Sequence, residues 1–440
     1  MQAYFFELAD GIATQLQGKE QFTCWLAAEH TDFVRFNRSA IRQSGHVRQI
    51  SLSLHLIEQG RHATANATLS GQLADDAATL ARLLVTLRAQ LPSLPVDPHL
   101  LIASEVHSST HIAPSALPPS SEIVAQVLQA AVGVDLVGIL AAGAMFRGFA
   151  NGYGQRNWHE STSFNLDWSL YQSRDKAVKS SYAGAHWEPA VFAAKIRDAI
   201  GQLAMLQRMP VSVRPGAYRA FLTPTAMQEI VSMFNWDGLS EKSLRTKQSS
   251  LRRMRDEDLR LHPSITLAEH TAAGIAPGFQ QDGFIKPARV SLIEQGRLVG
   301  SMIDPRSAME YGLASNGASG GEAAHALELE SGGLPMADVL SELDTGIYVS
   351  NLWYLNYSDR ANCRITGMTR FATFWVENGE IKAPLNVMRF DDSVYRLLGE
   401  NLLALTAERE LMLDNSSYLE RSSASAHLPG ALVQNFQFVL

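Results

Sequence analysis

The sequence feature that most constrains the fold is a change of hydrophobic period within the first 91 residues. Residues 50–56, Ile-Ser-Leu-Ser-Leu-His-Leu, alternate apolar with polar side chains, which places the aliphatic residues on one face of a strand. A Gln59-Gly60 turn then leads into a small polar strand over 61–69. Between Gly71 and Leu91, the leucines recur at helical spacing. The two periods in succession predict an α+β unit of curved sheet backed by helices.

The length and the prolines predict how the chain divides. At 440 residues it exceeds the roughly 250–300 residues that a single core serves. Residues 92–120 hold six of the 17 prolines, which indicates a linker or long loop. We expect an N-terminal α+β subdomain over 1–110, a middle α+β subdomain over 111–209 that completes it, and a C-terminal domain over 210–440.

The middle and C-terminal regions differ in pattern. Polar strands are expected from about Leu136 to Tyr182, followed by a helix over 190–209. The most apolar stretch, 123–146, contains Gln126, Gln129 and Asp135, so it predicts a buried helix and strand instead of a membrane span. After residue 210, short segments with Gly and Asn-Gly turns predict a mainly antiparallel β domain, barrel-like or sandwich-like, with a few helices.

Charge and cysteine content narrow the classes of partner. The chain has 37 basic and 44 acidic residues, a net charge of −7, which gives no general attraction for nucleic acid or an anionic membrane. The N-terminus lacks a basic segment before an apolar core and predicts an amphipathic helix instead of a signal peptide. Two isolated cysteines, Cys24 and Cys363, build neither a disulfide framework nor a Cys-x-x-Cys metal site. We therefore expect a cytoplasmic protein.

One short motif matches a catalytic pattern. Residues 317–321, Gly-Ala-Ser-Gly-Gly, fit the G-x-S-x-G turn that exposes a serine nucleophile, and His427 and Asp391 could complete a triad with Ser319. That turn follows an apolar strand, whereas the preceding residues here end a helix and enter a loop. The favoured interpretation is a small-residue loop that lets backbones approach closely.

Two other patterns bear on metal and nucleic-acid binding. His159-Glu160 begins like a zinc-binding helix motif, but no second histidine follows at the required spacing. The basic residues of 242–260 are interleaved with Glu241 and with 256–258, an Asp-Glu-Asp run, and lack aromatic residues spaced for base stacking. A solvated or subunit-facing surface is expected there.

The segment 223–234 predicts a helix with a clear beginning. Thr223 suits the N-cap and Pro224 the first turn, and the apolar residues at 227, 230, 231 and 234 share one face. Periodicity makes this a core helix with Glu229 outside the buried stripe.

From about residue 210 onward the sequence resembles the TldD/PmbA family of peptidase subunits, once called modulators of DNA gyrase. The similar segments, in the family's order, are 282–284, 290–300, 308–321 with its Ser-Asn-Gly turn, 344–352, 366–371 and 376–381. In the N-terminal region the nearest local match is 33–37.

The resemblance implies a division of labour between two kinds of subunit. One kind carries a His-Glu-x-x-x-His helix and a C-terminal cysteine that together hold a catalytic metal, and the other lacks them and pairs with the first. Here Gln228 and Met233 fall at the two histidine positions, and Glu229 falls at the glutamate. The segment 420–427 holds no cysteine. An amide and a thioether are poor zinc donors, so the resemblance implies no metal in this chain and a vestigial Glu229.

The expected function is therefore that of a non-metal, TldE/PmbA-like subunit, inactive alone. A TldD-like partner would supply zinc or a similar divalent ion, and the pair would hold and cut unfolded or extended peptides. Candidate surfaces toward substrate or partner are the strands of 150–185 and the loop 312–323, with Asn316, Gly317, Ser319 and Gly320. Two alternatives stay open from the sequence: a stand-alone serine hydrolase using Ser319, and a non-catalytic regulatory peptide-binding protein.

Overall fold

A computed structural model describes residues 1–173 and 176–439. Its N-terminal half is one seven-stranded sheet in the order β3-β2-β1-β5-β6-β4, with β7 on β6. All the neighbours are antiparallel except β4 and β6. The strands are β1 (Gln21–Asn37), β2 (Ala40–Glu58), β3 (Arg61–Leu69), β4 (Ser109–Ile112), β5 (Asp135–Asn151), β6 (Arg156–Ser173) and β7 (Lys176–Gly184).

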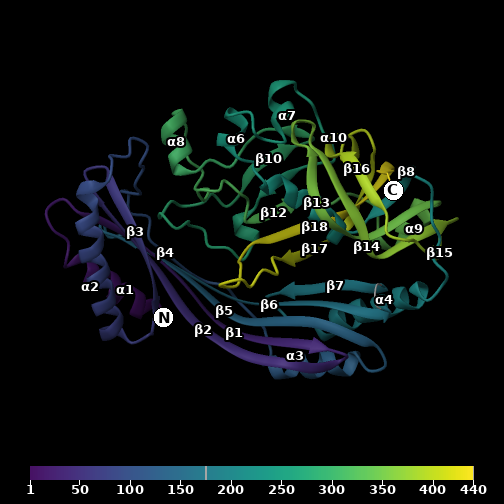
Figure 1. The fold of residues 1–440 in the computed structure, drawn as a ribbon, viewed down its shortest axis with the longest axis horizontal. Helices are drawn as coiled ribbons and strands as arrows, with labels where there is room; N and C mark the ends of the chain where they lie inside the picture. The colour runs from purple at the N-terminus through teal and green to yellow at the C-terminus, as the bar shows by residue number, and fades with distance from the viewer. Residues whose placement is uncertain (174–175, 440) are drawn as a thin grey trace.

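Helices cover the convex face of this bowed sheet at both ends (Figure 1). The helices are α1 (Gln2–Ala13), α2 (Leu73–Gln90), α3 (Ser120–Ala130) and α4 (Pro189–Leu206). Leu52, Leu54 and Leu56 join the core beneath α1 and α2, as the alternation predicted. The apolar stretch of 123–146 forms α3 and the start of β5, and none of the helices among the described residues is long and apolar enough to cross a membrane.

The C-terminal half builds the second, eleven-stranded sheet. Its strands are β8 (Gly216–Leu222), β9 (Leu267–Glu269), β10 (Val290–Glu294), β11 (Arg297–Leu298), β12 (Ala326–Leu329), β13 (Gly346–Asp359), β14 (Arg364–Glu377), β15 (Glu380–Pro384), β16 (Arg389–Ser393), β17 (Leu402–Leu413) and β18 (Ser425–Phe438). Five of them close on themselves in the order β18-β16-β14-β13-β8, with β8 returning to β18. The α+β class and the barrel-like C-terminal domain are confirmed.

Short helices pack in and around this closed part. They are α5 (Pro224–Ser232), α6 (Glu241–Arg245), α7 (Arg252–Asp256), α8 (Pro305–Tyr311), α9 (Val339–Leu343) and α10 (Val394–Leu397). The predicted helix over 223–234 is α5 followed by a 3-10 turn over Met233–Asn235. Thr223 caps it as expected: its Oγ1 accepts a hydrogen bond from the Ala226 N–H at 3.2 Å.

The two halves share a wide internal contact. The polar residues of β6 that alternate with its core face, among them His159, Ser163 and Asn165, are buried because the C-terminal half lies on them. The expectation that the strands of 150–185 present a surface to a partner or substrate is therefore wrong for these positions. The division of the chain at residues 110 and 209 stays a prediction, and one sheet spans both N-terminal parts.

Hydrogen bonds of Arg421 hold the connection between β17 and β18 against the N-terminal sheet. The buried Arg421 guanidinium donates to the Gly143 carbonyl at 3.2 Å and to the Ser163 carbonyl and hydroxyl at 3.2 and 2.9 Å. The Arg147 guanidinium in turn donates to the Arg421 carbonyl at 3.2 Å. These contacts position the β17–β18 connection, which forms one wall of a cavity between the two halves.

Candidate functional site

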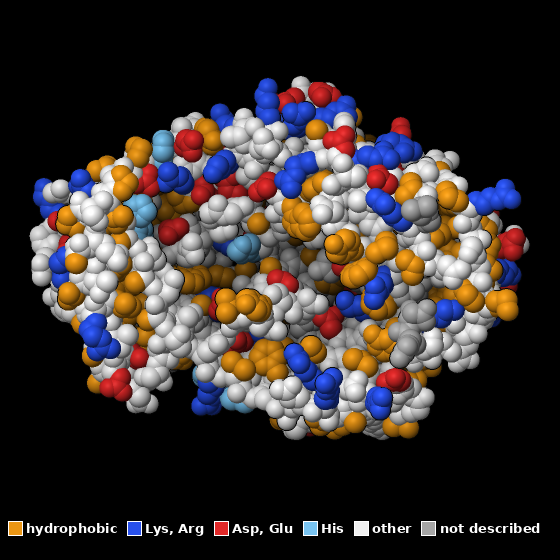
Figure 2. Space-filling view, in the orientation of Figure 1, with side chains coloured by type: hydrophobic (Ala, Val, Ile, Leu, Met, Phe, Trp, Pro, Cys, Tyr) orange, Lys and Arg blue, Asp and Glu red, His pale blue; other side chains and the backbone are white. Residues whose placement is uncertain are grey.

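A cavity of about 380 Å³ lies between the two halves of the molecule. Figure 2 shows this face hollowed where the halves meet. Its walls come from α5, from β7, and from the neighbouring ends of β17 and β18, where Leu413 pairs with Ser425. The site therefore combines segments that are far apart in the sequence.

One wall of the cavity is a strand edge. Within the part of the chain that the structure describes, β7 pairs only with β6, so its other edge is free. Lys179, Ser180 and Ser181 all line the cavity although neighbouring side chains of a strand point to opposite faces. The cavity therefore lies beside this edge, whose outward backbone groups pair with no other strand among the described residues.

Helix α5 contributes some of the predicted positions to the cavity. Gln228 and Glu229 line it, together with Thr225 and Ser232. Met233 does not: its side chain is 2% exposed and belongs to the hydrophobic core of the C-terminal half. Around the 3-10 turn, Ser232, Asn235 and Trp236 face the cavity, whereas Met233 does not. The register that places Met233 at the second histidine stays a prediction.

Glu229 sits in a partly desolvated place although its side chain is exposed at the cavity mouth. Loss of solvent raises the pKa of Glu229 above its ordinary value, and the positive charge of Lys179 opposes this. Asp167, another lining residue, accepts a hydrogen bond from the Asn415 side chain at 2.7 Å, which ties β6 to the loop after β17. Lys179, Asp167 and Asn415 had no signal in the sequence, because only the packing of the two halves brings them together.

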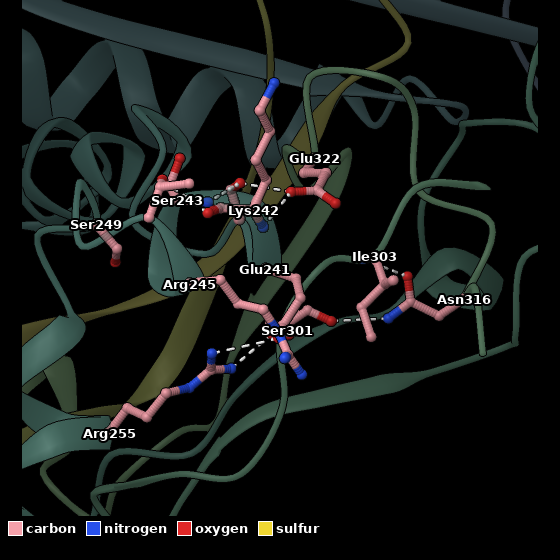
Figure 3. Close-up of polar contacts among 12 residues, drawn as sticks. Glu241, Lys242, Ser243, Arg245, Ser249, Arg255, Ser301, Ile303, Asn316 and Glu322 are labelled. Carbon is pink, nitrogen blue, oxygen red and sulfur yellow. Dashed lines mark hydrogen bonds and ion pairs between the residues drawn. The ribbon is translucent and has the colours of Figure 1, made fainter. Parts of the chain in front are cut away.

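The loop 312–323 is held by buried hydrogen bonds, which Figure 3 shows around α6. The Asn316 side chain accepts from the Ile303 N–H at 2.9 Å and donates to the Ser301 carbonyl at 2.8 Å. Glu322 accepts from the Ser240 hydroxyl at 2.5 Å and from the Lys242 N–H at 3.0 Å. These contacts anchor both ends of the small-residue segment.

The remaining candidates of this loop differ in accessibility. Gly317 is buried with φ +70°, and a Cβ there would lie 2.6 Å from the Ile285 carbonyl oxygen. This close backbone approach is what the small-residue interpretation predicted. Ser319 is half-buried and Gly320 is exposed. Whether this loop meets a partner or a substrate stays a prediction.

The proposed serine triad is not assembled. Strand β16, which carries Asp391, meets β18 at Phe438, roughly 36 Å along that strand from His427 at about 3.3 Å per residue. Asp391 is instead paired with the Arg364 guanidinium. Because Asp391 and His427 lie on distant parts of the sheet, the alternative of a serine hydrolase that uses Ser319 with these two residues is wrong in this form.

The other motifs also have structural partners. His159 stacks on His111 at 5.2 Å, and its Nε2 lies 3.1 Å from the Ile275 carbonyl oxygen. In the basic segment of 242–260, Arg245 and Arg255 bind the buried carboxylate of Glu241 at 2.7 and 2.5 Å. These arginines stabilise the fold around α6 (Figure 3).

Residues 215–439 match the sequence profile described as the PmbA/TldA metallopeptidase C-terminal domain. The chain belongs to the PmbA/TldD family. A stretch of 127 residues is 33% identical to the metalloprotease PmbA of Escherichia coli O157:H7, and it covers 28% of this chain. The match spans only 26% of that relative's length.

Solved structures of similar fold cover nearly the whole chain. TldE from Thermococcus kodakarensis aligns with a TM-score of 0.80 at 14% identity, over 99% of this chain and 100% of that one. A candidate modulator of a DNA gyrase from Thermotoga maritima aligns with a TM-score of 0.77 at 13% identity, over 99% and 100%. A candidate modulator of DNA gyrase from Bacteroides thetaiotaomicron aligns with a TM-score of 0.75 at 16% identity, over 99% of this chain and 98% of that one. At these identities the likeness shows the PmbA/TldD fold alone.

The metal that the PmbA/TldD family implies does not fit the residues of this cavity. Helix α5 offers the Gln228 amide, the Glu229 carboxylate and the Ser232 hydroxyl, and no imidazole or thiolate lines the cavity among the described residues. Across 1–173 and 176–439, no three His, Cys, Asp or Glu side chains are grouped so that they could hold an ion. Helix α5 thus offers one carboxylate with an amide and a hydroxyl, a poor donor set for zinc, and the other lining carboxylates, Asp167 and Asp414, are not grouped with Glu229 so that the three could hold an ion.

Proposed function

We propose that this chain is the non-metal subunit of a two-subunit peptidase whose metal is supplied by a second member of the PmbA/TldD family. One observation carries the proposal: the cavity at the family's metal helix retains Glu229 and a free strand edge but lacks imidazole and thiolate donors among the described residues. Such a site suits holding a chain more than activating water.

The substrate in this proposal is an unfolded or extended peptide. A free β7 edge binds a further strand through backbone groups, so it tolerates many side chains. The partner would complete the chamber and contribute zinc or a similar divalent ion. We place the complex in the cytoplasm, because Cys24 and Cys363 are both free and buried.

The test is reconstitution with a family member that carries the His-Glu-x-x-x-His helix. The purified chain alone, the partner alone and the mixture are each assayed for cleavage of an unstructured peptide. We expect activity only in the mixture, with loss on chelation and no effect of Ser319→Ala in this chain. Cleavage by this chain alone would contradict the proposal, and a peptide-binding chain that never supports cleavage would favour a regulatory role.

A further inference from the structure

A row of alternating cations and aromatic rings leads from the cavity wall to the surface. Lys179 Nζ lies 6.0 Å from the ring centre of Phe371, and the Arg370 guanidinium lies 5.4 Å from the same ring. Arg370 also stacks on Trp353 at 4.2 Å, and the Trp353 and Tyr354 rings are 5.5 Å apart. We call these five residues the cationic rim.

The backbone of the cationic rim is strained at two aromatic residues. Tyr354 has φ +58° and Phe371 has φ +60°, and both lie where the β13 and β14 register shifts at a bulge. Bulges with a residue in the left-handed region usually place glycine there, since other residues cost about 1 kcal/mol. Strain of this kind is often kept where it serves binding. Here it turns Tyr354 outward, 75% exposed, beside Trp353 at 44%.

The two cations of the rim have unused hydrogen-bond donors. Within the part of the chain that the structure describes, neither the Lys179 ammonium nor the Arg370 guanidinium forms an ion pair or donates a hydrogen bond. A guanidinium stacked on a ring keeps its N–H edge free, and that edge matches a carboxylate in bidentate geometry. The exposed rings can pack against a neighbouring apolar side chain.

The charges beside the rim favour an anionic ligand on one side only. A second hollow on the concave face of the sheet shares Lys179 with the cavity and adds Arg35 and Arg42, against Asp167 as its acidic group. Toward α5 the cavity instead carries Glu229 and Asp414. Carboxylates are therefore expected at the rim and not beside α5.

We propose that the cationic rim binds acidic segments of an extended peptide, with carboxylates on Arg370 and Lys179 and an apolar neighbour against Trp353 and Tyr354. This proposal rests on the proposed function and names its substrate class, namely peptides with Asp, Glu or a C-terminal carboxylate near the segment that enters the cavity.

The first test is binding to the full chain without any partner. Two labelled unstructured peptides of equal length, one containing Glu and the other Gln at the same positions, are compared by fluorescence anisotropy at low and high salt. We expect tighter, salt-sensitive binding of the acidic peptide. Arg370→Gln should weaken it by up to about five-fold, the size of a partly exposed ion pair, and leave the neutral peptide unchanged. Lys179→Gln should weaken binding of the acidic peptide more than that of the neutral one.

The control variant is Arg82→Gln, an exposed arginine of α2 whose guanidinium donates to Thr79. It should leave both peptides unaffected, and unfolding curves verify that each variant is folded. Equal effects of Arg370→Gln on both peptides, or no effect on either, would overturn the proposal. The proposal would also be overturned if a single-stranded oligonucleotide displaced the labelled acidic peptide at a lower concentration than the same peptide without label does.

Reconstitution separates this proposal from the proposed function. If the mixture with the metal-bearing subunit cleaves acidic and neutral peptides equally, and Arg370→Gln changes neither rate, the rim proposal is wrong and the subunit role stands. If no mixture cleaves any peptide but the anisotropy results hold, the subunit role is wrong and the acidic-peptide site stands.

Discussion

Replacing Gly317 by alanine should destabilise the protein more than any other glycine substitution in the loop 312–323. Its φ of +70° costs an alanine about 1 kcal/mol. The added Cβ would also lie 2.6 Å from the Ile285 carbonyl oxygen and 3.2 Å from the Lys286 Cα, both backbone atoms that cannot rotate away. Overlap of this kind typically costs about 1–3 kcal/mol, so we expect a total of about 2–4 kcal/mol.

The same loop supplies two matched controls. Gly312 has φ +66° but nothing within 4 Å of its Cβ position, so Gly312→Ala should cost at most about 1 kcal/mol. Gly321 has open space and no positive φ, and Gly321→Ala should be neutral or stabilise by about 0.5 kcal/mol through the unfolded chain.

The assay is the free energy of unfolding in urea for the three variants and the parent chain. The expected order of stability is Gly321→Ala, then Gly312→Ala, then Gly317→Ala. Equal losses for Gly312→Ala and Gly317→Ala would show that the approach to Ile285 is not what constrains this loop, and the account of the loop as a tightly packed structural segment would be refuted.

Three further predictions concern charged groups. Glu241, whose arginine partners and Ser301 hold its pKa at about 2, should stabilise the fold above pH 4.5 and less as the pH falls toward 2. Glu241→Gln should therefore cost about 2 kcal/mol at pH 7, after allowance for the partly exposed arginines, and less at pH 3 in urea unfolding. Arg421→Met should lower the free energy of unfolding by about 2–3 kcal/mol, because it leaves buried acceptors without a donor. Arg421→Lys should not restore that stability, since one ammonium does not span the Gly143 and Ser163 carbonyls. Calorimetric unfolding of both variants checks this. Lys179→Met should raise the pKa of Glu229 further, because the opposing positive charge is lost, and carboxyl titration by NMR would contradict this if the pKa fell.

Local patterns in the sequence were sufficient for much of the fold. The alternation of 50–56 appears as β2, the leucine stripe as α2, and the Thr-Pro start of α5 forms with the expected cap. Each of these depends on a period or on a few neighbouring residues, so the information is contained in the segment itself.

The polar strand β6 shows what local patterns cannot give. Its alternating Asn and Ser residues are typical of a solvent-facing side, but the C-terminal half buries them. The same limit applied to Ser319: the sequence contained the motif, while the positions of His427 and Asp391 depend on strand order in the sheet.

By itself the sequence determined the α+β class, the placement of the main helices and the resemblance to the PmbA/TldD family, while the assignment of Gln228 and Met233 to the family's histidine positions stays a prediction. Only the tertiary structure decided that Gln228 and Glu229 face a cavity while Met233 lies in the core, and that Lys179, Arg370 and Trp353 share one rim. The physical reason is how far apart in the sequence the contacting residues lie. Secondary structure follows from residues a turn or a strand apart, whereas a site between two packed sheets follows from contacts hundreds of residues apart, which no local pattern specifies.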